Sequence, residues 1–147
     1  MNINVAWIGK TKEPAVQALT DEYLKRISRY AVVDGLVLKD EGSLAPLLNG
    51  ARSRPKNFLV LLDSRGKQLS SEELAEFLRQ RQESSSQPVL FAIGGADGFS
   101  AERRKSAGLV LSLGRMTLAH ELARVVLLEQ IYRAFTILTG HPYHSGH

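Results

Sequence analysis

The chain has 147 residues, of which 44% are hydrophobic and 23% are charged, and it contains no cysteine. These values lie close to globular averages and exclude a disordered chain, a disulfide framework and a cysteine-based zinc site. The formal net charge of +4 fits a polyanionic partner such as a nucleic acid. No run reaches the roughly 20 apolar residues that span a bilayer, and no signal-peptide pattern is present. We therefore expect a cytoplasmic protein that does not enter a membrane.

The N-terminal part of the chain predicts two strands separated by a helix. The first strand is expected over residues 3–8, followed by a basic turn, Gly9-Lys10-Thr11-Lys12. A helix should begin near Pro14, because proline is favoured in the first helical turn. The second strand is expected over residues 32–38 and a short helix over residues 44–51.

The middle of the chain continues this alternation. Residues 57–62 are continuously apolar, as in a parallel strand that is covered on both faces. Ser70 and Glu73 predict a capping box at the start of a helix that continues to about Gln82. Residues 88–93 predict another buried strand. Alternating strands and helices predict a single α/β domain over the whole chain, with an open, mainly parallel sheet.

A glycine-rich turn, Gly94 to Gly98, directly follows the strand at residues 88–93. Two interpretations are open, because glycines let a backbone approach a ligand closely but also permit a sharp turn without any ligand. The spacing matches neither the dinucleotide fingerprint nor the phosphate loop. Ligands of open α/β sheets bind outside the carboxyl ends of the strands. We therefore expect the loops after Leu62, Ile93 and Leu113 to form one site.

A short basic helix should follow the glycine turn. Ser100 is expected to cap this helix, which includes a basic triplet formed by Arg103, Arg104 and Lys105. The triplet fits contacts with phosphates, although such a run is more often a solvated helix face. A fifth strand is expected over residues 108–113.

The last expected helix extends from Ala119 to about Leu138 and is apolar on more than one face. One small sheet covers only one face of such a helix, so a second copy in a C2 homodimer is the simplest further cover. Glu129 and Arg133 stand four residues apart with the acid first, which favours an intrahelical ion pair.

The C-terminal tail contains a histidine at every third position from His141 to His147. Pro142 and Gly146 break any helix that would align these histidines, so we expect no metal site. Tyr143 and His144 are suited to stack on a nucleobase and to move a proton. A polar terminus without such a role is the alternative.

Four segments of the C-terminal half resemble those of one known family. They read Ile93-Gly94-Gly95-Ala96-Asp97-Gly98, Leu111-Ser112-Leu113-Gly114-Arg115-Met116-Thr117-Leu118-Ala119-His120, Leu127-Leu128-Glu129-Gln130-Ile131-Tyr132-Arg133-Ala134 and His141-Pro142-Tyr143-His144. In order and spacing they are similar to the RlmH group of SPOUT methyltransferases. The resemblance implies a homodimer with a C-terminal trefoil knot, S-adenosylmethionine as methyl donor, and methylation of N3 of the pseudouridine at position 1915 of 23S ribosomal RNA, within the large subunit or the assembled ribosome.

The same resemblance implies roles for individual residues. The cofactor pocket would be lined by Leu62, Gly95, Gly114, Arg115, Met116, Thr117, Leu118 and Ala119. Tyr143 and His144 would be the catalytic residues at the target uridine, with the partner subunit as one source of the tail. Contacts with RNA would come from Arg124 and the basic triplet.

Two positions depart from the family pattern. Ala119 stands where members commonly have proline, and Ser145 stands where they usually have arginine or lysine. The lost proline at Ala119 and the lost cation at Ser145 leave room for an alternative function, a non-catalytic RNA-binding or ribosome-assembly protein with the same fold.

Overall fold

A five-stranded parallel sheet forms the centre of this computed structural model, which describes residues 1–50 and 56–143. The strands are β1 (Asn2–Ile8), β2 (Val32–Leu38), β3 (Phe58–Gln68), β4 (Val89–Ile93) and β5 (Leu109–Ser112). They lie in the order β2-β1-β4-β3-β5, and every neighbouring pair is parallel. The open parallel α/β sheet predicted from the sequence is confirmed.

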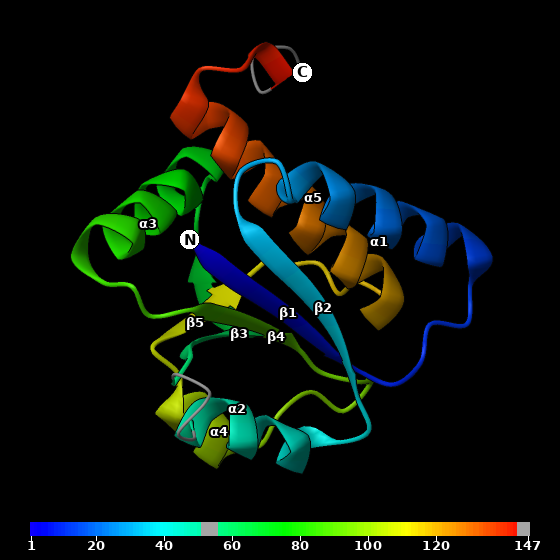
Figure 1. Cartoon of the computed structure of the whole chain (residues 1–147). Coiled ribbons are helices and arrows are strands. Elements are labelled where there is room, and N and C mark those ends of the chain that lie inside the picture. The colour runs from blue at the N-terminus through cyan, green and yellow to red at the C-terminus, as the bar shows by residue number, and fades with distance from the viewer. Residues whose placement is uncertain (51–55, 144–147) are drawn as a thin grey trace.

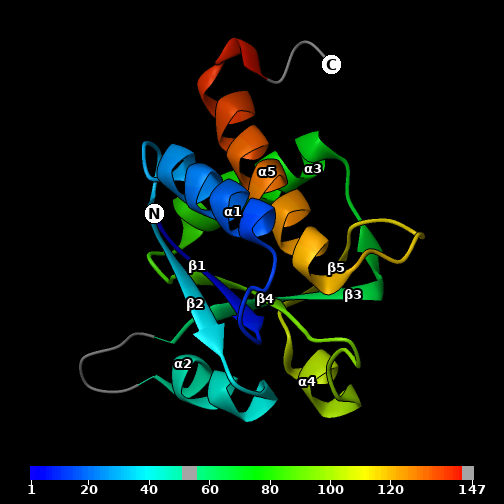
Figure 2. The ribbon, with the colours of Figure 1, turned by 90° about the vertical axis from the view of Figure 1, so that its right-hand side faces the viewer.

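Helices cover both faces of this sheet (Figures 1 and 2). One face packs against α1 (Pro14–Ile27), α3 (Ser71–Ser84) and α5 (His120–Thr139), and the other against η1 (Glu41–Leu44), α2 (Ala45–Asn49) and α4 (Ala101–Ser106). The helix expected over residues 44–51 is thus a 3-10 turn followed by α2, with residue 51 outside the described part. No helix among the described residues has the length and apolar character needed to cross a membrane.

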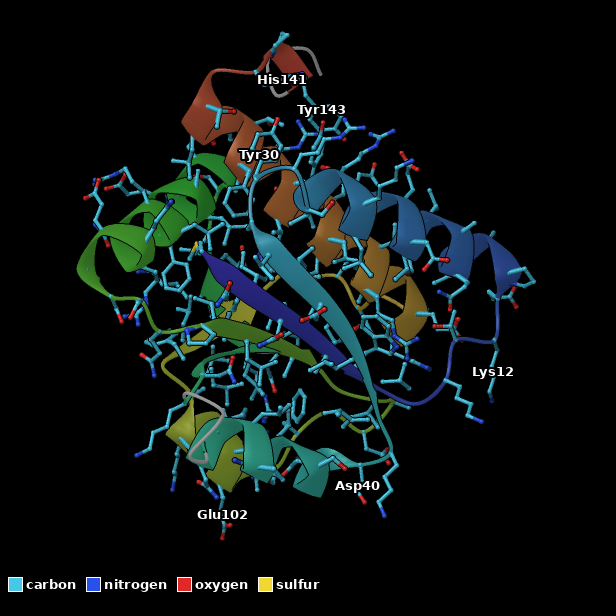
Figure 3. The ribbon with its side chains drawn as sticks, viewed as in Figure 1. Lys12, Tyr30, Asp40, Glu102, His141 and Tyr143 are labelled. Atoms are coloured by element: carbon cyan, nitrogen blue, oxygen red, sulfur yellow. The ribbon has the colours of Figure 1, made fainter. Side chains whose placement is uncertain are left out.

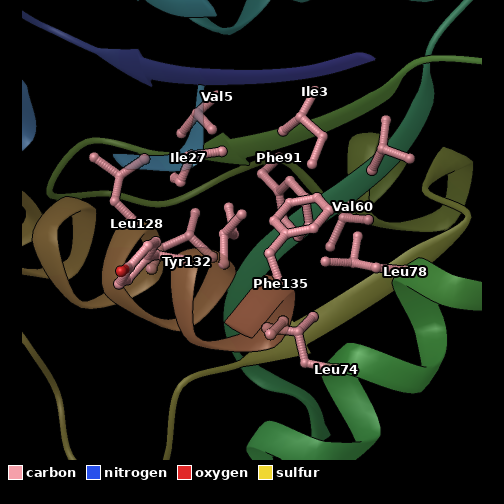
Figure 4. Packing of buried hydrophobic residues seen from close by; sticks show 14 of the residues in the cluster. Ile3, Val5, Ile27, Val60, Leu74, Leu78, Phe91, Leu128, Tyr132 and Phe135 are labelled. Carbon is pink, nitrogen blue, oxygen red and sulfur yellow. The ribbon is translucent and has the colours of Figure 1, made fainter. Parts of the chain in front are cut away.

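Side chains of the central strands alternate between two hydrophobic cores. On β4, Val89, Phe91 and Ile93 belong to the core under α1, α3 and α5, and Leu90 and Ala92 belong to the opposite core. Figure 4 shows the larger core, in which residues of the sheet meet residues of α3 and α5. Every residue of β4 is buried, which explains why this strand is continuously apolar.

The apolar helix α5 is covered on two sides by helices of its own chain. Tyr132 packs against Tyr23 of α1, with ring centroids 6.1 Å apart. On the other side, Gln130 accepts a hydrogen bond of 2.6 Å from the hydroxyl of Ser71 in α3. Much of the apolar surface from which the sequence predicted a second copy is therefore buried within one chain, but Leu122 stays 48% exposed. The homodimer remains a prediction.

The predicted local pairs at helix termini and on α5 are confirmed. Ser70 Oγ accepts from the backbone N–H of Glu73 at 3.0 Å, and the Glu73 carboxylate accepts from the N–H of Ser70 at 2.8 Å. Ser100 caps α4 by accepting from the N–H of Arg103. Arg133 and Glu129 form an ion pair of 2.8 Å.

Strand β3 is longer than its apolar run predicted because it contains a bulge. Leu62 and Lys67 both pair with Leu111 of β5, so residues 63–66 are looped out between them. At Gly66, an added Cβ would lie 2.6 Å from the carbonyl oxygen of Val110. This contact is with backbone, which cannot move aside without shifting β5.

We expect Gly66→Ala to lower the free energy of unfolding by about 1–3 kcal/mol, the usual range for overpacking a tight site. Urea titration would measure the change. Gly42→Ala is a matched control, because its added Cβ would meet only the Asp40 side chain at 3.4 Å. Equal stability of the two variants would contradict the close approach of β3 and β5.

Candidate functional site

A cavity of about 300 Å³ opens beside the bulge of β3 and the carboxyl ends of β4 and β5. Its walls are the loops at residues 62–65, 93–98 and 113–118, and the first turn of α5 adds His120 and Ala123. The three loops that the sequence places at one edge of the sheet therefore lie together. The bulge of β3 supplies one wall, which links the pocket to the β3–β5 pairing.

The residues expected to hold a cofactor lie in or beside this cavity. Six of them line it: Leu62, Gly95, Gly114, Met116, Thr117 and Leu118. Arg115 and Ala119 are not part of the lining. Met116 is 83% exposed, so a large apolar side chain stands in solvent at the pocket.

Ala119 immediately precedes α5 and has a φ of −55°. This value lies within the range that the proline ring imposes. The loop therefore has the backbone conformation at this residue that a proline would give it, although alanine stands there. Ser145, the second departure from the family pattern, lies outside the described residues.

The glycines of the turn after β4 are explained by different constraints. Gly98 has a φ of +70°, which side-chain-bearing residues rarely adopt. At Gly94, an added Cβ would lie 3.1 Å from the backbone of Gly98. Gly95 has neither constraint, because its φ is not positive and its added Cβ would meet only Ile8 at 4.0 Å. Turn geometry accounts for Gly94 and Gly98 but leaves Gly95, which lines the pocket, unexplained.

Asp63 places a carboxylate in the pocket wall, with only 7% of its side chain exposed. It accepts hydrogen bonds from the backbone N–H and the guanidinium of Arg65, at 2.8 and 3.2 Å, and Arg104 of α4 lies 3.8 Å away. Burial raises the pKa of Asp63, but these hydrogen bonds and the two cations outweigh it and lower the pKa overall. Asp63 is therefore ionised at neutral pH and is paired with Arg65, which lines the same pocket.

Asp63→Asn should destabilise the protein by about 1–2 kcal/mol at pH 7, because charge-assisted hydrogen bonds are lost. Because the pKa of Asp63 is lower in the folded protein, its ionised carboxylate stabilises the fold fully above the ordinary pKa of 3.8. This stabilisation is lost as the pH falls through the pKa of the folded protein. The difference between wild type and variant should therefore be constant above about pH 5 and shrink below it. Urea titrations across this range would measure it, and a pH-independent difference would contradict an ionised Asp63.

Arg124 does not lie where the sequence predicted a contact with RNA. It is 1% exposed and is the largest fully buried side chain of the described residues. Its guanidinium donates to the carbonyls of Ile8 and Gly9 and to the hydroxyl of Thr11, at 2.9–3.1 Å. Burial lowers its pKa. In this conformation Arg124 cannot reach a phosphate in solution, and its contacts are with the loop after β1.

The basic triplet does not form one surface. Arg104 donates to the carbonyl of Phe99 at 2.7 Å and faces Asp63, Arg103 is half-buried, and Lys105 is exposed. A contact with RNA by these residues remains a prediction.

Tyr143 lies at the far end of α5 from the pocket. The helix has 20 residues, so its ends are roughly 30 Å apart. The Tyr143 ring packs edge-on against Tyr132 at 4.7 Å and beneath the Arg133 guanidinium at 5.1 Å. Burial, together with the Tyr23 hydroxyl, raises the pKa of Tyr143 to about 12. His144, the predicted proton-handling residue, lies outside the described residues.

Sequence reasoning missed some of the pocket residues. Asp63, Ser64 and Arg65 line the wall made by the β3 bulge, and His120 and Ala123 line the wall made by α5. One signal was available for Asp63, because a charged residue directly after a buried parallel strand stands at the binding edge of the sheet. Nothing in the sequence pattern indicated the bulge.

Comparison with known proteins matches the whole described chain. The family described as "Predicted SPOUT methyltransferase" matches residues 1–144. A Koribacter versatilis protein named ribosomal RNA large subunit methyltransferase H is 57% identical over 147 residues, which is all of both chains. A Geotalea daltonii protein with the same name is 46% identical over 154 aligned positions, covering 98% of this chain and 99% of its own.

Two solved structures share the fold at low sequence identity. A probable methylase family protein of Haemophilus influenzae has a TM-score of 0.59 at 13% identity, over 97% of this chain and 70% of its own. The SpoU methyltransferase AviRb of Streptomyces viridochromogenes, solved with AdoMet, has a TM-score of 0.53 at 15% identity, over 90% of this chain and 57% of its own.

Proposed function

The chain belongs to the SPOUT methyltransferase family, and on this premise we propose that it methylates N3 of a pseudouridine in 23S ribosomal RNA. S-adenosylmethionine is the proposed methyl donor. The substrate class follows from the names of relatives that are 57% and 46% identical over essentially full length. The position within the RNA follows from the resemblance of the four C-terminal segments.

The absent side chain at Gly95 is the observation that best supports a cofactor. Neither backbone conformation nor packing within the chain requires glycine there, yet the position lines the cavity. A ligand lying against the turn supplies the missing reason. The cavity of about 300 Å³ is at the lower end of the range for small-molecule sites.

The proposed reaction divides the work between cofactor and protein. When bound, the sulfonium cofactor supplies an already activated methyl group. The chain's residues must then align the target base and remove the N3 proton. We assign proton removal to His144, because imidazole titrates near neutral pH, and stacking on the base to Tyr143.

The position of Tyr143 leads us to propose that each site is shared by two subunits. Tyr143 and the pocket lie at opposite ends of α5, roughly 30 Å apart. Figure 3 shows Tyr143 and His141 together at one extremity of the molecule. A homodimer in which the tail of one subunit reaches the pocket of the other joins the two parts. The trefoil knot of the C-terminal third belongs to the same proposal.

Deleting the gene should remove one methyl group from a pseudouridine of 23S ribosomal RNA, which mass mapping of the RNA would detect.

The purified protein should bind S-adenosylmethionine in a calorimeter, and Gly95→Leu should abolish binding by filling the cavity. Thermal denaturation of Gly95→Leu is the control, because an added Cβ there would meet only Ile8, at an ordinary contact distance of 4.0 Å. A wild type that binds no S-adenosylmethionine would contradict the enzyme and favour a non-catalytic RNA-binding protein.

Mixing two inactive variants tests whether the site is shared. Gly95→Leu destroys the pocket, and His144→Ala destroys the tail. When the two variants are mixed and their subunits pair at random, about a quarter of the wild-type number of active sites should be recovered. The reason is that half of the dimers are mixed and each of these has one intact pocket facing one intact tail. A radiolabelled methyl-transfer assay after joint refolding would measure this.

Two results would contradict parts of this proposal. No recovery in the mixture would show that the pocket and tail act within one chain. If His144→Ala alone keeps the wild-type rate at saturating cofactor, the assignment of proton removal to His144 is wrong.

A further inference from the structure

The basic turn between β1 and α1 has no role in the function proposed above. It comprises Gly9, Lys10, Thr11 and Lys12, here called the β1–α1 loop. Lys10 and Lys12 are both exposed. Neither forms an ion pair with any of the described residues. Figure 3 shows Lys12 extending away from the body of the molecule.

Two side chains in the first turns of α5 hold this loop in place by hydrogen bonds. The buried guanidinium of Arg124 donates to the carbonyl of Gly9 and the hydroxyl of Thr11, at 3.1 and 2.9 Å. The carboxylate of Glu121 accepts from the backbone N–H groups of Lys12 and Glu13, at 3.1 and 3.2 Å. These hydrogen bonds lower the pKa of Glu121. Two charged side chains of one helix thus fix the backbone on both sides of the lysines.

The same helical turns form part of the pocket wall. His120 and Ala123 line the cavity, and they alternate in sequence with the loop-holding Glu121 and Arg124. On the sheet side, β1 pairs directly with β4, with Trp7 opposite Ile93 at the pocket edge. The loop is therefore attached to the pocket by both the sheet and α5.

Backbone conformation also constrains the loop. Gly9 has a φ of +90°, and its N–H donates to the carbonyl of Leu38 at the end of β2. Glycine is needed for this conformation.

The two nearest charged groups of α5 do not neutralise the lysines, because Glu121 is occupied by backbone N–H groups and Arg124 is itself a cation. The lysines are thus ordered at their backbone and open at their ammonium groups.

From this arrangement we infer that the β1–α1 loop binds the phosphate backbone of the RNA beside the target base, through Lys10 and Lys12. The inference rests on the proposed function for the identity of the RNA. Lysine binds phosphate as a point charge and displaces counterions, which adds affinity without sequence readout. Arg124 and Glu121 are positioning residues, since they touch the loop and not the RNA.

The test is RNA binding as a function of salt for Lys10→Gln and Lys12→Gln, with 23S ribosomal RNA from a strain lacking the gene as the probe. Each substitution should reduce the slope of log affinity against log salt by about one unit, because one phosphate contact is lost. Affinity for the RNA should fall by about threefold to tenfold per lysine at physiological salt. Affinity for S-adenosylmethionine should not change.

Lys56→Gln is the matched control. Lys56 is exposed and precedes β3 at the amino edge of the sheet, opposite the pocket. If Lys10→Gln and Lys12→Gln bind RNA with the same slope and affinity as Lys56→Gln, the role of the loop is overturned. RNA binding can be measured without methyl transfer, so this outcome can be told apart from failure of the proposed function. Failure of the proposed function would instead appear as a wild-type protein that is inactive in the methylation assay.

Discussion

The parallel alignment of the five strands is the constraint on which the site depends. Since all strands run in the same direction, the bulge of β3 meets the loops after β4 and β5 at one edge of the sheet, although these segments are separated by up to about fifty residues in sequence. Burial on both faces keeps this alignment, because β4 contributes alternate side chains to two separate cores. The pocket is thus a consequence of how the core is packed.

Helix α5 joins the pocket to the rest of the molecule. Its middle is buried between α1 and α3, while its beginning supplies His120 and Ala123 to the cavity and Arg124 to the end of β1. An arginine in so buried a place is tolerated because its Nη atoms meet two carbonyls and a hydroxyl. Movement of α5 would therefore alter the pocket wall and the β1–α1 loop together.

Much of the fold was predictable because its signals are local. Apolar runs, the Ser70–Glu73 box and Pro14 mark element boundaries through backbone and solvent effects that need no tertiary information. The bulge of β3 was not predictable, because residues 63–66 are polar and their pairing depends on β5. The burial of Arg124 was missed for the same reason, since its partners are more than a hundred residues away in sequence. For α5 the apolar pattern was recognised and its cover was assigned to a second copy; α1 and α3 supply much of that cover, while Leu122 stays exposed and the homodimer stays a prediction.

The glycine turn shows how far sequence reasoning about the site could go. From the sequence alone, a bare turn and a ligand-binding turn predict the same three glycines. The structure separates them, because φ explains Gly98 and backbone proximity explains Gly94, whereas Gly95 is left without an internal reason. The charges of the two regions also differ, because Asp63 in the cavity wall is paired with Arg65, whereas Lys10 and Lys12 on the adjoining loop form no ion pair with the described residues. A polyanionic acceptor is attracted by the unpaired lysines outside the cavity, whereas the Asp63–Arg65 pair in its wall adds no net charge that would repel a cationic methyl donor.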